Sequence, residues 1–138
     1  MNSHLMTFRV RYAECDPMGV AHHTAYPVWF EMGRTELLRE SQATNRPQHP
    51  LTYRDFEEQG VLLAVVSLNV RYKRSARYDD LLTLNTKIIN IGRAKLEHEY
   101  ELFRDGLLLA TASTTLACLD RNGRPRPLPA ELGEYTST

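Results

Sequence analysis

Alternation of apolar and polar residues is the feature that most limits the fold of this chain, because it recurs in four segments of the C-terminal half. In each segment the apolar residues occupy every second position, as expected for strands with one buried face. We expect strands at 64–72, 82–88, 95–102 and 109–118. Gly92 and the pair Asp105-Gly106 lie between them as hairpin turn signals. The pattern predicts an antiparallel sheet.

A single helix is expected ahead of these strands, over 26–40. Its apolar residues fall at i, i+3, i+4, i+7 and i+11, which is one stripe of a helix. They are Tyr26, Trp29, Phe30, Gly33 and Leu37. Gly33 costs about 1 kcal/mol of helix propensity relative to Ala, and we expect close approach of the helix to a sheet as compensation. Thr24 is the expected N-cap and Pro27 a first-turn residue.

The order of elements predicts an α+β fold. A further alternating segment at 7–12 precedes the helix, so the order is β-α-β-β-β-β. Pro47 and Pro50 mark an irregular connection, and the prolines of 125–138 predict an extended tail. We expect one domain over 1–138, in which residues 1–5 are either a disordered or a vector-derived start before Met6. One helix leaves the sheet edges open, which predicts at least a dimer.

Composition narrows the functional classes. The chain has 138 residues, and its 17 basic and 17 acidic residues balance to a net charge of zero. This balance gives no basic field for nucleic acid. No apolar run approaches the roughly 18 residues of a membrane span. Cys15 and Cys118 are too few for a disulfide scaffold and fit a reducing compartment, so we expect a cytoplasmic protein.

The loop before the helix carries the most informative chemistry. Asp16 and Gly19 lie in a turn just ahead of the expected helix start. The N-terminus of a helix offers free N–H groups that can hold a developing oxyanion. A carboxylate one turn away can act as nucleophile or general base on a carbonyl group. The alternative is that Asp16 only stabilises an Asx-type turn before Pro17.

With strand, loop and helix in this order, the chain resembles hotdog-fold acyl-CoA thioesterases. The nearest branch is the 4-hydroxybenzoyl-CoA thioesterase family, including its short bacterial Tol-Pal-associated acyl-CoA thioesterases. The matching positions are Arg11-Tyr12, Asp16, Met18-Gly19-Val20, His23, Tyr26, Trp29-Phe30-Glu31 and Arg34, followed by 70–72, 76–80 and 119–125. The resemblance covers nearly the whole chain, from Met6 to Pro129.

The resemblance implies hydrolysis of an acyl-CoA with Asp16 as the catalytic carboxylate and no metal or organic cofactor. It implies that the helix N-terminus around His23 supplies the oxyanion hole. Gly19, Val20, His22 and Tyr26 would position the substrate. It also implies a homodimer or a tetramer of two back-to-back dimers, with sites between protomers. Members usually have Thr in place of Cys15, often an aromatic residue in place of His22 and often Asn in place of Ala25.

A basic cluster follows the second predicted strand. It consists of Arg71, Lys73, Arg74 and Arg77, with Ser75 among them. Arg and Lys bind phosphates by charge-assisted hydrogen bonds, so these residues are candidates for the coenzyme A phosphates. The alternative is a solvated strand end. An acyl carrier protein is a second candidate carrier of the thioester.

Other candidates have structural interpretations that we favour. Adjacent His22 and His23 do not share a face and lack further ligands at metal-binding spacing. Cys15 has no histidine fixed beside it, so a packed thiol is expected. Glu31 is expected to be solvated or ion-paired, and His98 to be a satisfied core histidine.

The aromatic residues of the helix have two interpretations. Tyr26, Trp29 and Phe30 could line an apolar tunnel for the acyl group, but their helical spacing indicates core first.

Two other functions stay open from the sequence. One is a hotdog hydratase or dehydratase, which acts on a thioester without cleaving it. The other is a non-catalytic module that binds acyl-CoA or acyl carrier protein. Neither alternative requires Asp16 as the group that cleaves the thioester.

Overall fold

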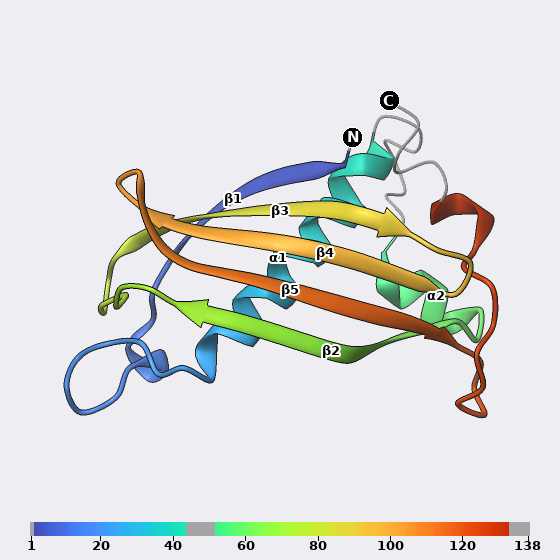
Figure 1. Ribbon diagram of the computed structural model, residues 1–138, viewed down its shortest axis with the longest axis horizontal. Coiled ribbons are helices and arrows are strands. Elements are labelled where there is room, and N and C mark those ends of the chain that lie inside the picture. Colours follow the sequence, from blue (N-terminus) through green and yellow to red (C-terminus); the bar gives the residue numbers. More distant parts are fainter. Residues whose placement is uncertain (1, 44–51, 133–138) are drawn as a thin grey trace.

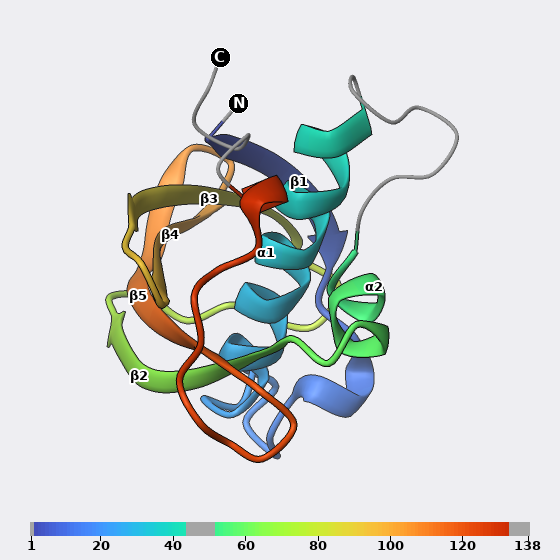
Figure 2. The ribbon, with the colours of Figure 1, turned by 90° about the vertical axis from the view of Figure 1, so that its right-hand side faces the viewer.

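The computed structural model describes residues 2–43 and 52–132, and the predicted α+β architecture is confirmed (Figure 1). One antiparallel sheet of five strands has the order β1-β3-β4-β5-β2. The elements are β1 (Ser3–Arg9), a 3₁₀ turn η1 (Tyr12–Glu14), α1 (Ala25–Ala43), α2 (Tyr53–Glu58), β2 (Leu62–Tyr72), β3 (Leu81–Ile91), β4 (Lys95–Arg104) and β5 (Leu107–Leu119). The sheet curves around α1, and α2 lies beside it (Figure 2).

The alternation predicted for the three central strands is confirmed. Their expected apolar sets face α1 and are buried, as in Leu82, Leu96 and Leu116. Asp105 and Gly106 both have positive φ, 49° and 77°, which is the two-residue turn that matches the twist of a hairpin. The central strands therefore supply the layer on which α1 rests.

The edge strand β2 departs from its predicted alternation. Its pairing with β5 shifts register between Val65 and Ser67. Val66, expected on the buried face, is 58% exposed, and Leu68 is 43% exposed. An edge strand is hydrogen-bonded to a neighbour on one side only, so its pattern is held less firmly than that of a central strand. This leaves an apolar edge open along β2.

The stripe predicted on α1 is confirmed, and so is the reason for Gly33. Trp29 and Phe30 are fully buried in the core. A Cβ added to Gly33 would lie against the hydroxyl of Thr86 and 2.7 Å from Leu84 Cδ2. The helix therefore approaches β3 too closely for any side chain. Pro27 lies in the first turn of α1, as expected, and Thr24 directly precedes it.

The first strand begins earlier and ends earlier than predicted. Residues Ser3, His4 and Leu5 pair with β3, so they are part of the sheet rather than a disordered start. Strand β1 ends at Arg9, and the chain then turns through η1. Tyr12, expected on the buried face, is 79% exposed and packs edge-on against Tyr78.

A second helix was not predicted from the sequence. Its N-cap is Thr52, whose hydroxyl accepts a hydrogen bond from Asp55 N–H while the Asp55 carboxylate accepts one from Thr52 N–H. This capping box was a readable signal. Phe56 is buried in a second core cluster with Leu37 of α1 and Leu132 of the tail. Pro47 and Pro50 lie outside the described residues.

The predicted tail is irregular from Pro125 to Pro129 and then forms a 3₁₀ turn in which Leu132 is buried. Its remainder, 133–138, lies outside the described residues. Neither helix in the described part of the chain has the length and apolarity needed to cross a bilayer.

Candidate active site

The Asp16 loop is a tight hairpin that leads into α1. Cys15 pairs with Ala21, and Asp16 N–H donates to Val20 O at 2.9 Å. Gly19 turns the chain with φ +80° and donates its N–H to Asp16 O at 2.9 Å. Val20 then pairs with Arg77 of the segment after β2. The half-buried Asp16 is thus held in a rigid turn ahead of the helix.

One of the two carboxylate oxygens of Asp16 stabilises the turn by a hydrogen bond. Oδ1 accepts a hydrogen bond from Met18 N–H at 2.9 Å, so the Asx-type turn is present. An ionised carboxylate offers about four acceptor positions on two oxygens, which leaves capacity beyond this bond. The turn role and a chemical role are therefore compatible in Asp16.

Glu14 fastens this hairpin to α1. Its carboxylate accepts hydrogen bonds from the indole N–H of Trp29 at 2.8 Å and from Arg11 N–H at 2.7 Å. Its backbone oxygen accepts His22 N–H at 2.7 Å. Burial alone would raise the pKa of Glu14, but these hydrogen bonds and the charge of Arg11 outweigh it and lower the pKa. Glu14 thus stays ionised and ties both ends of the loop to the helix.

The start of α1 presents backbone N–H groups beside this hairpin. Two of them are used locally: Thr24 N–H donates to His22 Nδ1 at 3.2 Å, and Ala25 N–H donates to His22 O at 3.0 Å. The Thr24 hydroxyl also bonds to His22 Nδ1 at 2.7 Å. The ring of His23 packs against that of His22, with 4.3 Å between centroids. N–H groups in a first turn lack intrahelical acceptors, which makes this end suited to negative charge.

A contact between β2 and the helix start closes a pocket there. The hydroxyl of Tyr72 donates to His23 O at 3.1 Å, and its ring packs edge-on against Tyr26. The resulting pocket has a volume of about 260 Å³. Its lining residues are Ala21, His23, Tyr26, Tyr72, Lys73, Arg74 and Ser75. It therefore unites two of the predicted carbonyl-binding residues, His23 and Tyr26, with three of the predicted coenzyme A residues. Four other predicted site residues do not line it: Asp16, Gly19, Val20 and His22.

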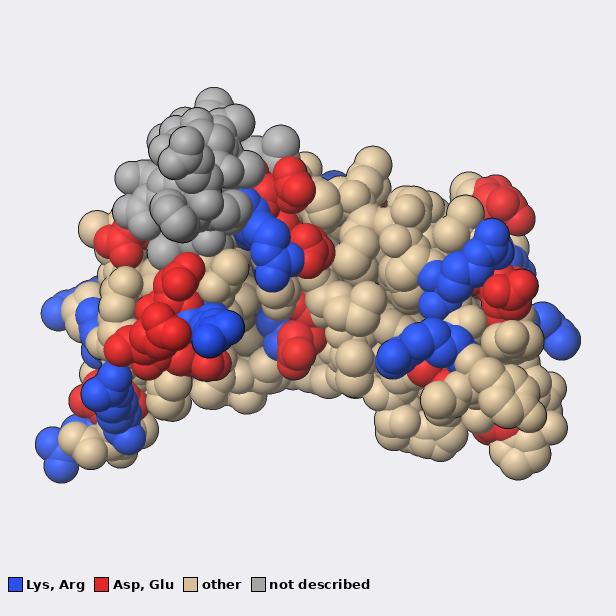
Figure 3. Space-filling view, turned by 180° about the vertical axis from the view of Figure 1, so that it is seen from behind, with Lys and Arg blue, Asp and Glu red and all other residues tan. Residues whose placement is uncertain are grey.

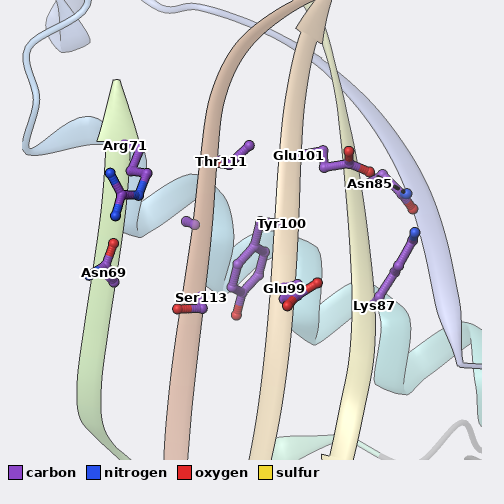
Figure 4. Close-up of a pocket in the computed structure, with 10 residues that line it drawn as sticks. Asn69, Arg71, Asn85, Lys87, Glu99, Tyr100, Glu101, Thr111 and Ser113 are labelled. Atoms are coloured by element: carbon purple, nitrogen blue, oxygen red, sulfur yellow. Dashed lines mark hydrogen bonds between the residues drawn. The ribbon is translucent and has the colours of Figure 1, made fainter. Parts of the chain in front are cut away.

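The remaining basic residues fall in two places. Arg77 pairs through its backbone with Val20 of the Asp16 hairpin, and its N–H donates to Asp80 Oδ2 at 2.8 Å. Arg71 lies apart from the others, because alternation along β2 directs it to the sheet face away from α1. There it lines a polar groove of about 360 Å³ with Asn69, Lys87 and their neighbours (Figure 4).

The cysteines have the packed environments expected of them. Cys15 Sγ donates to Arg11 O at 3.6 Å, and Cys118 Sγ donates to Pro127 O at 3.6 Å. Burial raises the pKa of Cys118. Burial, with the nearby carboxylates of Glu14 and Asp16, also raises the pKa of Cys15. A raised pKa disfavours the thiolate and so argues against a cysteine nucleophile.

Two further residues test the structural interpretations. Glu31 is largely exposed and lies 3.9 Å from Arg34, so the ion-paired interpretation is confirmed. His98 is buried in the core as expected, but neither ring nitrogen has a hydrogen-bond partner within the described residues, so it is not satisfied. Burial and the charge of Arg34 lower the pKa of His98 to about 3, which keeps it neutral. No group of three potential metal-ligating side chains occurs in the described ranges.

Three residues of the site region were missed by sequence reasoning. Glu14 carried no recognisable spacing signal toward Trp29, fifteen residues away. Tyr72 belongs to an alternating strand and to the family match at 70–72, but neither pattern predicts its contact with His23. Arg34 was noted within a motif but given no role. Each gains its position from contacts between elements, which periodicity does not report.

Comparison with known proteins gives a consistent result. The thioesterase-like superfamily matches residues 10–135. The acyl-CoA thioesterase YbgC of Haemophilus influenzae is 35% identical over 120 residues, 87% of this chain and 82% of that protein. The structure of DHNA-CoA thioesterase from Staphylococcus aureus superimposes with a TM-score of 0.88 and 31% identity, covering 99% of this chain and 90% of that one.

A more distant structure shows the fold alone. The 4-hydroxybenzoyl CoA thioesterase of Pseudomonas sp. strain CBS-3 matches with a TM-score of 0.83 at 22% identity, over 98% of this chain and 99% of that one. The hotdog fold that the sequence resemblance implies is therefore confirmed.

Proposed function

The chain belongs to the thioesterase-like superfamily, and on that premise we propose that it hydrolyses an acyl-CoA thioester to a free carboxylic acid and coenzyme A. The pocket at the start of α1 carries the proposal. In it, the Tyr72–His23 hydrogen bond of 3.1 Å joins the helix N-terminus to Lys73 and Arg74. The similarity to the acyl-CoA thioesterase of H. influenzae supports the same activity.

Thioester hydrolysis requires few catalytic groups from the protein. A thiol ionises near pKa 8.5, so the coenzyme A thiolate leaves without a strong general acid. The developing oxyanion would accept hydrogen bonds from the N–H of His23, just before α1, and from that of Tyr26 in its first turn. The N–H groups of Gly19 and His22 already donate within the loop, at 2.9 and 2.7 Å, so they support the turn.

Asp16 would supply the carboxylate in one of two ways. In the covalent route its free oxygen attacks the carbonyl carbon, the C–S bond breaks, and water then hydrolyses the mixed anhydride. In the general-base route Asp16 takes a proton from water, which attacks the same carbon. Both routes return the carboxylate to its ionised form after release of the acid.

Recognition of the coenzyme A part would fall to Lys73, Arg74 and Arg77, with Ser75 beside them. Lys73, Arg74 and Ser75 line the pocket at the start of α1, which we call the helix-start pocket. Arg77 pairs with Val20 of the Asp16 hairpin. Arg71 lines the polar groove on the opposite sheet face, so our proposal does not include it in this group. A carrier protein would present the same phosphopantetheine arm to these residues.

We also propose that two copies assemble through β2. This edge exposes Val65, Val66 and Leu68, and the hollow along the lower side of Figure 3 is formed mainly by uncharged residues. Edge-to-edge pairing would satisfy its open backbone groups and cover the apolar side chains. A site flanked by a second copy fits a domain with a single long helix. A tetramer of two such dimers remains the larger form to test, and the two reduced thiols support a cytoplasmic location.

The deciding experiment compares wild type with Asp16→Asn on a panel of aliphatic, aromatic and branched acyl-CoAs, with thiol release as the signal. Asn keeps the oxygen that accepts Met18 N–H, so the hairpin stays formed. We expect kcat to fall at least about 10²-fold, as for loss of a general base or nucleophile. Equal rates in the two proteins would refute the role of Asp16. Binding without thiol release by wild type would point to a binding module instead.

The phosphate contacts have their own test. Arg74→Ala and Arg77→Ala should raise KM for acyl-CoA more than for a truncated pantetheine thioester. Arg71→Ala is the matched control, because its side chain lies on the other face of the sheet. A similar KM increase for both substrates would contradict phosphate binding by Arg74 and Arg77.

A further inference from the structure

A second pocket, which we call the groove, lies between α1 and β2, next along both elements from the helix-start pocket. It has a volume of about 260 Å³. The walls are apolar and are formed by Pro27 and Val28 of α1 and by Val65 and Leu68 of β2. Arg34 and Thr114 also line the groove, and Glu31 lies at its rim. The groove therefore combines apolar walls with a polar end.

Arg34 is an unusual residue at such a place. It is 9% exposed, and the carboxylate of Glu31 lies 3.9 Å away on a side chain that is 69% exposed. Burial raises the pKa of the Tyr100 hydroxyl, and the nearby charge of Arg34 opposes that rise. A guanidinium has five N–H donors in a rigid fork that matches a carboxylate. The single contact with Glu31, at 3.9 Å, does not use this fork fully.

The surroundings of Arg34 are also polar beneath the groove. Thr114 is 3% exposed and its hydroxyl bonds to the Tyr100 hydroxyl at 2.7 Å. His98 stacks on Tyr100 and keeps two unpartnered ring nitrogens, among the described residues. A buried polar cluster with unused hydrogen-bonding capacity is costly unless something completes it. The groove gives a ligand access to its Arg34 end.

We propose that Arg34 binds the far end of the acyl group, and that the substrate class is acyl-CoA thioesters whose chain ends in a carboxylate. This proposal rests on the proposed thioesterase function. The apolar walls would hold the chain, and the Arg34 fork would take the terminal carboxylate with both oxygens. Glu31, which is largely exposed, would turn outward to solvent as the carboxylate enters.

The geometry of α1 sets the length of the chain. Eight residues separate Tyr26, in the helix-start pocket, from Arg34. At 1.5 Å per residue they advance by about 12 Å. An extended chain advances about 1.2 Å per bond, as in a polypeptide of 3.3–3.6 Å per three bonds. A chain of about eight to ten carbons would therefore reach from one pocket to the other.

The region beyond Arg34 indicates why the chain should end there. The groove continues into a section of about 210 Å³ that contains Glu57 as well as Glu31. The carboxylate of Glu57 at that position repels a ligand carboxylate that would pass further. Arg34 is thus the point at which an anionic end is best neutralised.

The test uses three thioesters of one length: octanoyl-CoA, 8-hydroxyoctanoyl-CoA and the CoA monothioester of octanedioic acid. Their kcat/KM values are measured with wild type by thiol release. We expect the carboxylate-ended substrate to exceed octanoyl-CoA by at least about tenfold, the effect of one charge-assisted hydrogen bond. The hydroxyl-ended substrate should lie between them. Octanoyl-CoA or the hydroxyl substrate in first place would overturn the proposal.

Variants of Arg34 assign the preference to this residue. Arg34→Met should bring the carboxylate-to-methyl ratio to one or below, mainly through KM, and Arg34→Lys should restore part of it. Arg39→Met is the matched control, since Arg39 lies on the same helix with an exposed Glu36 partner. An unchanged ratio in Arg34→Met would refute the role of Arg34. If that variant does not fold, the order among the three substrates in wild type still decides.

The outcomes also separate this inference from the thioesterase proposal. Hydrolysis of octanoyl-CoA without preference for the carboxylate end would leave the proposed function intact and remove the inference. Titration of the same three ligands into Asp16→Asn protein gives Kd values that do not depend on turnover. The same order of affinities is expected there, and a reversed order would overturn the inference even in a protein that hydrolyses none of them.

Discussion

Replacing Glu14 by Gln tests whether the Asp16 hairpin is held to α1 as the geometry indicates. The wild-type carboxylate accepts Trp29 Nε1–H at 2.8 Å, Arg11 N–H at 2.7 Å and an Arg11 guanidinium N–H at 3.3 Å. A Gln amide has one acceptor oxygen, so it can keep the Trp29 bond or the Arg11 backbone bond. Its NH₂ group would then face the other donor.

The expected loss of stability follows from these contacts. The Arg11 side chain is 71% exposed, so its ion pair adds little. One hydrogen bond to a charged group contributes about 1.5–3 kcal/mol, and the remaining bond weakens as it becomes neutral. We expect Glu14→Gln to lower the free energy of unfolding by about 2–3 kcal/mol. With a urea m value of about 2 kcal/mol/M, the midpoint should fall by roughly 1 M.

The pH dependence provides a second check of the same reasoning. The pKa of Glu14 lies below its ordinary value of 4.5 in the folded protein, so the carboxylate stabilises the fold above that pH. That stabilisation is lost as pH falls through the lowered pKa. The difference between wild type and Glu14→Gln should therefore be full at pH 7 and shrink below about pH 4.5.

Urea unfolding at fixed protein concentration, followed by tryptophan fluorescence and circular dichroism, gives the measurement. Glu58→Gln is the control, because its ion pair with Arg54 is exposed and should contribute about 0.3–0.5 kcal/mol at most. A midpoint shift for Glu14→Gln no larger than that of the control would refute the reasoning. So would a difference that stays constant from pH 7 to pH 3.

Three other changes have defined outcomes. Gly33→Ala should lower the unfolding free energy by about 1–3 kcal/mol, although Ala has the better helix propensity, because the new Cβ would lie 2.7 Å from Leu84. Higher stability of the variant would show that the helix can move. Val66→Lys on the β2 edge should shift sedimentation toward the monomer, and an unchanged assembly would exclude this edge as the interface. His98→Leu should remove acid-induced destabilisation between about pH 6.5 and 3. In the wild type the buried imidazole, with a pKa of about 3, stays neutral in this range, whereas the imidazole of the unfolded chain takes up a proton. An unchanged dependence of stability on pH would contradict this.

The elements that face one another across the core were predictable from the sequence. The apolar sets of β3, β4 and β5 and the stripe of α1 face one another, so each position was fixed by burial on a known period. The prediction failed at β2, where Val66 is exposed, and at β1, which begins at Ser3. Edge strands are held by one neighbour, and their limits depend on where that neighbour ends.

The candidate site was predictable in its residue types but only partly in its arrangement. The Asp16 turn and the helix start are neighbours in sequence, so local chemistry brought them together. Arg71 and Arg74 are also close in sequence. Arg71, however, lies on the face of β2 away from α1, whereas Arg74 follows the end of this strand and lines the pocket at the start of α1.

The sequence by itself therefore determined the α+β layers, the close helix–sheet contact at Gly33 and the turn that presents Asp16. These features follow from period, backbone conformation and hydrogen bonds within a few residues. Only the tertiary structure decided that Tyr72 would bond to His23, that Glu14 would bond to Trp29 and that Arg34 would line a groove. Such contacts join residues from different elements, and their distances depend on how the helix packs across the sheet, which no local pattern encodes.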